Sequence, residues 1–187
     1  LEFRRCALPI LFRTRKGFSH KAGRINRYLG EWQAAGFRAG LMHSNLAWQH
    51  EIRAEYDAST FDTDPFEPQP QGAGTILPFW VDHPDGGFLE LPYTLPQDST
   101  LFLILREPSI RIWREKLAWL AVHRGLAFVT THPDYISFGN FPSARQYPIQ
   151  HYRDLLAHVR DHYAGRFWHA LPREVAGHAR SHRAGLL

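Results

Sequence analysis

A histidine that follows a strand-like segment is the first residue here that suggests acid–base chemistry. The residues at 126–131, LAFVTT, are apolar or β-branched, and His132 and Pro133 come directly after them. This composition predicts a buried strand over 126–132. Proline disfavours helical backbone in the preceding residue, so we expect His132 to be extended, with its imidazole aimed in a fixed direction. A histidine can give or take a proton near neutral pH.

The elements around this histidine are predicted from hydrophobic periodicity, caps and turns. Short strands alternate with helices, which is typical of an α/β fold with a largely parallel sheet. In such folds the chemistry gathers at the carboxyl ends of the strands, where His132 is expected to lie. The expected helices are 21–36, 45–52, 109–125, 152–165 and 172–184, and the expected strands are 37–42, 54–60, 75–81, 87–95 and 126–132.

Composition limits the classes of function. The chain has 187 residues, of which 44% are hydrophobic, and a formal net charge of +4. This fits one domain, and the basic residues form no dense run, so we expect no nucleic-acid partner. A single cysteine excludes an internal disulfide framework. No apolar run reaches the roughly 18 residues of a membrane span, so we expect no membrane partner. No signal peptide is evident, which favours a cytoplasmic protein over a secreted one.

Four stretches, in this order and at this spacing, resemble bacterial polysaccharide deacetylases of the NodB-homology type. They are FRAGLMHSNLAW, YDASTFDTDPFEPQP, ELPYTLPQDSTLF and THPDY. The resemblance implies an incomplete, irregular (β/α) barrel for this chain. It also implies a hydrolase of carbon–nitrogen bonds other than peptide bonds, which removes acetyl groups from glycans with zinc or another divalent metal.

The resemblance covers only part of the family's machinery. Two family motifs, an aspartate pair and a metal-binding histidine pair, belong before the helix expected at 21–36, yet residues 1–18 contain no aspartate or histidine. The chain also begins at Leu1 and has Met42 as its only methionine, which indicates a fragment or a processed chain. We therefore expect an atypical segment at 1–18, a partial deacetylase domain at 19–187, no metal cofactor in this chain and no activity of the chain alone.

The motifs that this chain does carry match the opposite side of the family's active site. His132 matches the family's general acid, which protonates the leaving group, and Arg38 matches the arginine that orients the catalytic aspartate. The acid is expected to be held by a carboxylate from the acidic loop, with Asp62 the first choice and Asp64 the second. Three residues are candidates for substrate binding, namely Trp80, Asp64 and Tyr135.

Several alternatives stay open at this point. LPYTL also resembles an allantoinase-like branch that hydrolyses a small cyclic amide, and a barrel without metal ligands could be an inactive glycan-binding fragment. The pairs His158/His162 and His178/His182 have the i, i+4 spacing of metal ligands, but they are expected on outer helix faces. Loss of the first strands would leave an unpaired sheet edge through which the chain could associate with itself.

Overall fold

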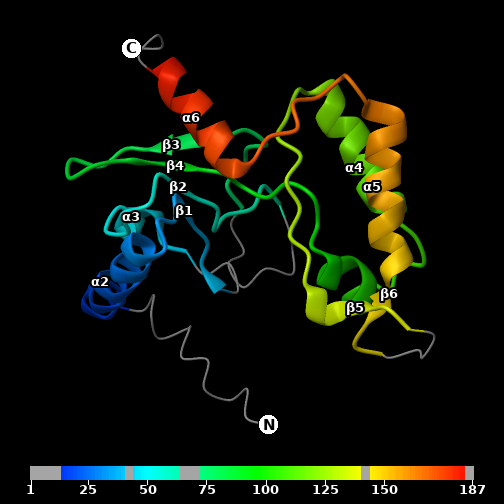
Figure 1. The fold of residues 1–187 in the computed structure, drawn as a ribbon, viewed down its shortest axis with the longest axis horizontal. Helices are drawn as coiled ribbons and strands as arrows, with labels where there is room; N and C mark the ends of the chain where they lie inside the picture. The colour runs from blue at the N-terminus through cyan, green and yellow to red at the C-terminus, as the bar shows by residue number, and fades with distance from the viewer. Residues whose placement is uncertain (1–13, 41–43, 64–71, 140–143, 184–187) are drawn as a thin grey trace. The chain divides into compact units, whose positions relative to one another are not determined.

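The computed structural model describes residues 14–40, 44–63, 72–139 and 144–183, and these form two compact units (Figure 1). The first unit contains the described residues up to Pro92 together with those from Ala170 onward. The second unit runs from Tyr93 to His169. None of the described helices is both long and apolar enough to cross a membrane. The expected residue Asp64 lies outside the described residues.

A four-stranded sheet forms the centre of the first unit. Its strands are β1 (Gly36–Phe37), β2 (Tyr56–Asp57), β3 (Phe79–Val81) and β4 (Phe88–Glu90), in the order β1-β2-β4-β3. The pairs β1–β2 and β2–β4 are parallel, whereas β3 and β4 form an antiparallel hairpin. The register sets Asp57 opposite Glu90 on neighbouring strands, which brings two carboxylates together inside the sheet.

Helix α2 (Arg15–Glu31) precedes this sheet and begins six residues earlier than predicted. The Thr14 side chain accepts a hydrogen bond from the backbone N–H of Gly17 and so caps the first turn. The helix ends before Gln33, which has left-handed backbone (φ 51°). The predicted end, Gly36, lies instead in β1, where a Cβ would lie 2.0 Å from the Tyr56 ring.

Two further helices belong to the first unit. Helix α3 (Leu46–Gln49) is a single turn capped by the Asn45 side chain, and α6 (Pro172–Arg183) closes the described chain. Arg180 of α6 pairs with Glu55 beside β2 at 2.9 Å, and Arg183 pairs with Asp82 after β3. These ion pairs join the end of the chain to the sheet. The apolar residues Phe18, Ala22, Leu29 and Ile52 form a buried cluster under α2 and α3.

The second unit is built from helices around aromatic side chains. Its elements are η3, a π-helix (Ser99–Ile104), α4 (Arg111–Val122), η4, a 3₁₀ turn (Pro133–Tyr135), α5 (Ile149–Tyr163) and the parallel pair β5 (Ile136–Ser137) and β6 (Tyr147–Pro148). Trp113 of α4 is fully buried, and its indole N–H donates to the carbonyl of Pro96 at 2.7 Å. Phe102 of η3 packs edge-on against Trp113 and lies 4.6 Å from Tyr147.

The predicted buried strand at 126–132 is wrong in type and in burial. The segment forms a single bridge, between Val129 and Leu95, and its side chains are half-buried or exposed. The carbonyl of Phe128 accepts from the backbone N–H groups of Thr94 and Leu95. The Thr94 hydroxyl adds two further hydrogen bonds, because it donates to the carbonyl of Leu126 and accepts from the N–H of Phe128. A side chain thus supplies part of the pairing that a regular ladder would take from the backbone.

The architecture is mixed α/β, with one four-stranded and one two-stranded sheet among the described residues. The other predicted strands are shorter than expected, and η3 was not predicted at all. The incomplete (β/α) barrel stays a prediction, as does self-association through a sheet edge.

Candidate functional site

The carboxylate of Asp98 organises a polar centre in the second unit. Asp98 is completely buried, at 0% exposure. Its Oδ1 accepts from the backbone N–H of Ser99 at 2.8 Å and lies 2.6 Å from Nδ1 of His132. Its Oδ2 accepts from the backbone N–H of His132 at 2.6 Å and from the hydroxyl of Tyr147 at 3.0 Å. These contacts compensate the cost of burying a charge.

Local structure delivers Asp98 to this position. Asp98 precedes η3, and its side chain caps that helix through Ser99. Its backbone N–H points to the carbonyl of Thr130, at 3.4 Å, which draws the segment before His132 alongside. The π-helix is notable because π-turns often occur at functional sites.

His132 is held by its backbone and by its ring. Its φ of −121° and ψ of 112° confirm the extended conformation expected before Pro133. The side chain of His132 is 38% exposed, whereas Asp98 beside it has no exposure. Because Nδ1 faces the carboxylate, Nε2 is the nitrogen that can exchange a proton with a bound molecule. An aspartate–histidine pair of this kind serves as a general acid or base.

Aromatic residues surround the pair. Burial raises the pKa of the Tyr147 hydroxyl far above its usual value, and the neighbouring Asp98 raises it further. Tyr147 therefore stays protonated and acts as a donor to Asp98. The ring of Tyr135 lies 5.0 Å from the ring of His132, so the structure brings together two of the residues expected from the sequence.

A second polar centre lies in the first unit, at the ends of β2 and β4. Glu90 is buried, and its Oε1 accepts from the N–H of Ser59, the N–H of Thr60 and the hydroxyl of Thr60, at 2.7–3.0 Å. Asp57 Oδ1 accepts from the N–H of Ala58 and from the Ser59 hydroxyl. The other oxygens, Asp57 Oδ2 and Glu90 Oε2, are buried and have no hydrogen-bond partner. One proton shared between the two carboxylates would satisfy both oxygens.

Electrostatics favour such a shared proton. Burial and, to a smaller extent, the charge of Asp57 together raise the pKa of Glu90 to about 8. Burial also raises the pKa of Asp57, to about 6, against the hydrogen bonds from Ser59 and Ala58 that lower it. Two carboxylates in contact cannot readily both be ionised. This pair is therefore expected to hold a proton in the folded chain at neutral pH.

The remaining predicted site residues lie in the first unit. Arg38 donates from Nε to the carbonyl of Ala58 at 2.9 Å, close to the Asp57–Glu90 pair. Asp62 is buried, and its Oδ1 accepts from the N–H of Thr63 at 2.6 Å. Trp80 is half-buried on β3, and one face of its ring is covered by the Arg183 guanidinium, 4.1 Å from the ring centre. The catalytic and substrate-binding roles of these residues stay predictions.

The carboxylate that contacts His132 within the second unit is Asp98. Asp62 belongs to the first unit, and its expected role as the partner of His132 stays a prediction. The sequence contained a signal for Asp98. Asp98 ends LPYTLPQD, one of the stretches that carries the deacetylase resemblance, but an aspartate before an apolar stretch was not singled out. The acidic loop holds several carboxylates, whereas Asp98 is a single aspartate buried beside the bridge between Leu95 and Val129.

A metal ion beside His132 would need further ligands close to it. In the described ranges, the histidine and carboxylate groups that come together in a set of three are His50, His83 and Asp85, all in the first unit. The described residues around His132 therefore do not fit a metal ion, and no chemical step is assigned to one. A pocket of about 390 Å³ in the second unit is lined by residues of α4 and α5 and does not include His132.

Comparison with protein-family models, with curated proteins and with solved structures finds no match for this chain. The deacetylase resemblance therefore stays a prediction from the motifs.

Proposed function

We propose that this chain supplies the general acid of a polysaccharide-deacetylase-type hydrolase, with His132 as the acid and Asp98 as the residue that positions it. The substrate class, an N-acetylated glycan, follows from the motif resemblance. The observation that carries the proposal is the 2.6 Å contact between a fully buried carboxylate and a partly exposed imidazole. Carboxylate, extended backbone and proline together hold the ring in one orientation.

The chemistry of amide hydrolysis suits this arrangement. Water adds to the acetyl carbonyl, and the tetrahedral intermediate then collapses with cleavage of the carbon–nitrogen bond. The amine nitrogen is a poor leaving group unless it takes a proton as the bond breaks. Imidazolium at His132 would supply that proton from Nε2, giving the free amine and acetate. Asp98 would stabilise the charged ring and keep the other proton on Nδ1.

The test is a comparison of two substrates. Acetate release from an N-acetylated chitooligosaccharide is measured beside hydrolysis of allantoin, using the chain alone and the chain joined at residue 19 to the first two motifs of an active deacetylase. We expect no turnover by the chain alone and acetate release by the joined chain. Turnover of allantoin without acetate release would favour the cyclic-amide branch. Glycan binding without turnover in either form would indicate a binding module and contradict the proposal.

A further inference from the structure

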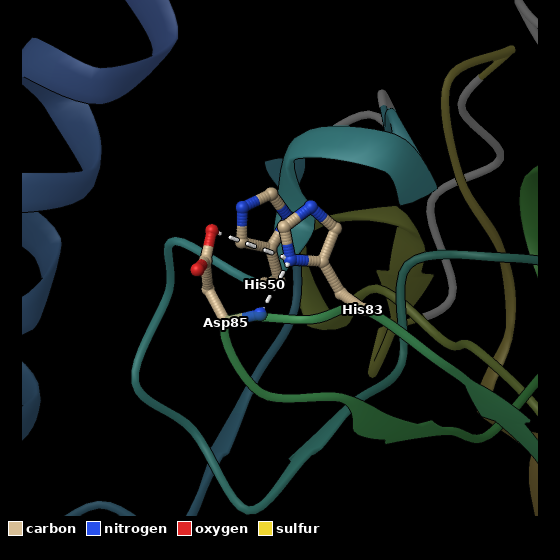
Figure 2. Close-up of side chains that lie close together, drawn as sticks. All are labelled: His50, His83 and Asp85. Atoms are coloured by element: carbon tan, nitrogen blue, oxygen red, sulfur yellow. Dashed lines mark hydrogen bonds and ion pairs between the residues drawn. The ribbon is translucent and has the colours of Figure 1, made fainter.

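We propose that His50, His83 and Asp85 form a binding site for one divalent transition-metal ion of the zinc class. The three side chains come from two separate loops of the first unit and converge at one point (Figure 2). One ligand atom from each of them lies within 4.8 Å of the others. Imidazole nitrogens and a carboxylate oxygen are ligands that zinc accepts readily. The proposal is independent of the acid role of His132.

Two of the ligands are fixed by the turn between β3 and β4. The backbone N–H of Gly86 donates to the carbonyl of His83 at 3.0 Å, which closes a turn around Pro84 and Asp85. The N–H of Asp85 donates to Nδ1 of His83 at 3.1 Å. Since Nδ1 accepts this hydrogen bond, it carries a lone pair and no proton. A lone pair on nitrogen is what a metal ion requires, so the ion would replace the N–H as the partner of Nδ1.

The third ligand comes from the end of α3. His50 is the C-terminal cap residue of this helix, and its ring stacks on His83 with centroids 3.4 Å apart. Nδ1 of His50 is buried and has no hydrogen-bond partner among the described residues. A buried polar nitrogen without a partner carries a free-energy cost, which coordination of an ion would remove.

The distances are close to those of a bound ion. Ligands of a tetrahedral zinc site lie about 3.3 Å from each other, given metal–nitrogen bonds of about 2.0–2.1 Å. Nδ1 of His83 lies 3.7 Å from Oδ2 of Asp85. The two rings are within 9° of parallel, so one of them must rotate for both nitrogens to meet one ion. His83, with 26% of its side chain exposed, is at the surface of the site.

The surroundings leave a position for a fourth ligand. A pocket of about 460 Å³ is lined by His50 and Asp85 together with residues of α2, among them Arg15 and Asn26, and with Glu51 and Arg53 after α3. Three protein ligands with one open position are typical of zinc sites that bind water or an exchangeable ligand.

The sequence did not predict this site. The expectation of no metal in this chain came from the absence of the deacetylase metal motifs, and the three residues proposed here lie outside them. Their separation of more than thirty positions hides the cluster, because only the folded sheet brings the β3–β4 turn next to the end of α3.

The experiment is titration of the untagged, chelator-treated chain with Zn²⁺ by calorimetry, with Co²⁺ absorption as a second probe. We expect one ion per chain, the visible absorption bands of tetrahedral Co²⁺, and a rise in melting temperature with added Zn²⁺. His83→Ala should abolish all three. Asp85→Asn, at an exposed position, should keep the fold and weaken binding by about tenfold or more.

The matched control removes the other candidate ligands. His158→Ala/His178→Ala breaks both helical histidine pairs and should leave binding at one ion per chain unchanged. Loss of binding in this double variant, with binding retained in His83→Ala, would overturn the proposal. So would the absence of saturable Zn²⁺ binding at micromolar concentrations in the unaltered chain.

Discussion

Asp98 contacts His132 twice, through the backbone N–H at one carboxylate oxygen and through the imidazole Nδ1 at the other. The backbone contact fixes where the residue lies, and the ring contact fixes how its side chain is turned. A third group, the Tyr147 hydroxyl, binds the oxygen that receives the backbone N–H. The His132 side chain is thus positioned by one buried carboxylate.

The first prediction concerns the tautomer of His132. Asp98→Asn keeps the shape of the side chain but replaces one acceptor oxygen with a donor. The Oδ2 position faces two donors, whereas the Oδ1 position faces one donor, the N–H of Ser99, and the ring nitrogen. We therefore expect the amide NH₂ to turn toward the ring and to donate to Nδ1, which leaves the Ser99 N–H without its acceptor. Neutral His132 should then carry its proton on Nε2 instead of Nδ1. Nitrogen-15 NMR of the imidazole shows directly which ring nitrogen carries the proton. An unchanged tautomer would contradict the assigned role of Asp98.

A second prediction ranks two variants by stability. Asp98→Ala leaves several buried donors without an acceptor, at roughly 1–3 kcal/mol for each group that finds no water. Tyr147→Phe removes a single donor, so it should cost only about 1 kcal/mol. The free energy of unfolding, measured in urea, should therefore be much lower for Asp98→Ala than for Tyr147→Phe. Equal stabilities would show that the carboxylate does not organise the centre.

The Asp57–Glu90 pair predicts a pH dependence of stability. The folded pKa values of Asp57 and Glu90, about 6 and about 8, lie above the ordinary values of 3.8 and 4.5 for these side chains. At pH values between the ordinary and the folded pKa, the folded state binds more protons than the unfolded state, so the free energy of unfolding falls as pH rises. The stabilising contribution is complete below about pH 4 and is lost as pH rises through 6 to 8.

Glu90→Gln tests this dependence. The amide oxygen can accept the three hydrogen bonds that Glu90 Oε1 accepts, and the NH₂ can donate toward Asp57, as a protonated glutamate would. We expect the variant to reduce the decline in stability between pH 5 and pH 8, as measured by urea unfolding across that range. Glu31→Gln, at an exposed helical position, is the control and should leave the decline unchanged. An unchanged decline in Glu90→Gln would mean that the pair is ionised when folded.

Two glycines should respond to alanine in opposite directions. Gly23 lies inside α2 with no atom near the place of a Cβ, so Gly23→Ala should stabilise the chain by up to about 1 kcal/mol. A Cβ at Gly87 would lie 2.6 Å from the carbonyl oxygen of Val81, so Gly87→Ala must displace the β3–β4 hairpin. We expect it to lower the melting temperature and to weaken Zn²⁺ binding at His83 and Asp85. A melting temperature for Gly87→Ala equal to that of the unaltered chain would count against the packing described for this turn.

Sequence reasoning succeeded where a signal is local. Pro133 fixed the backbone of the residue before it, and hydrophobic periodicity located α4, α5 and α6 to within a few residues. It failed where distant groups decide the outcome. The hydroxyl of Thr94 makes two of the hydrogen bonds of the segment before His132, and the Tyr56 ring leaves no room for a side chain at Gly36. The carboxylate that contacts His132 comes from a residue 34 positions away. Such pairings depend on three-dimensional packing, which no spacing rule encodes.

The central claim, that His132 is a general acid, is tested most directly by the kinetics of His132→Ala. The variant is made in the chain joined to the missing motifs, and kcat and KM for acetate release are measured together. We predict a fall in kcat of about 10²–10⁴ with little change in KM, the usual scale for loss of a general acid. His123→Ala, at an exposed position after α4, is the control and should keep full activity. Full kcat in His132→Ala, or an equal loss in the control, would contradict the claim.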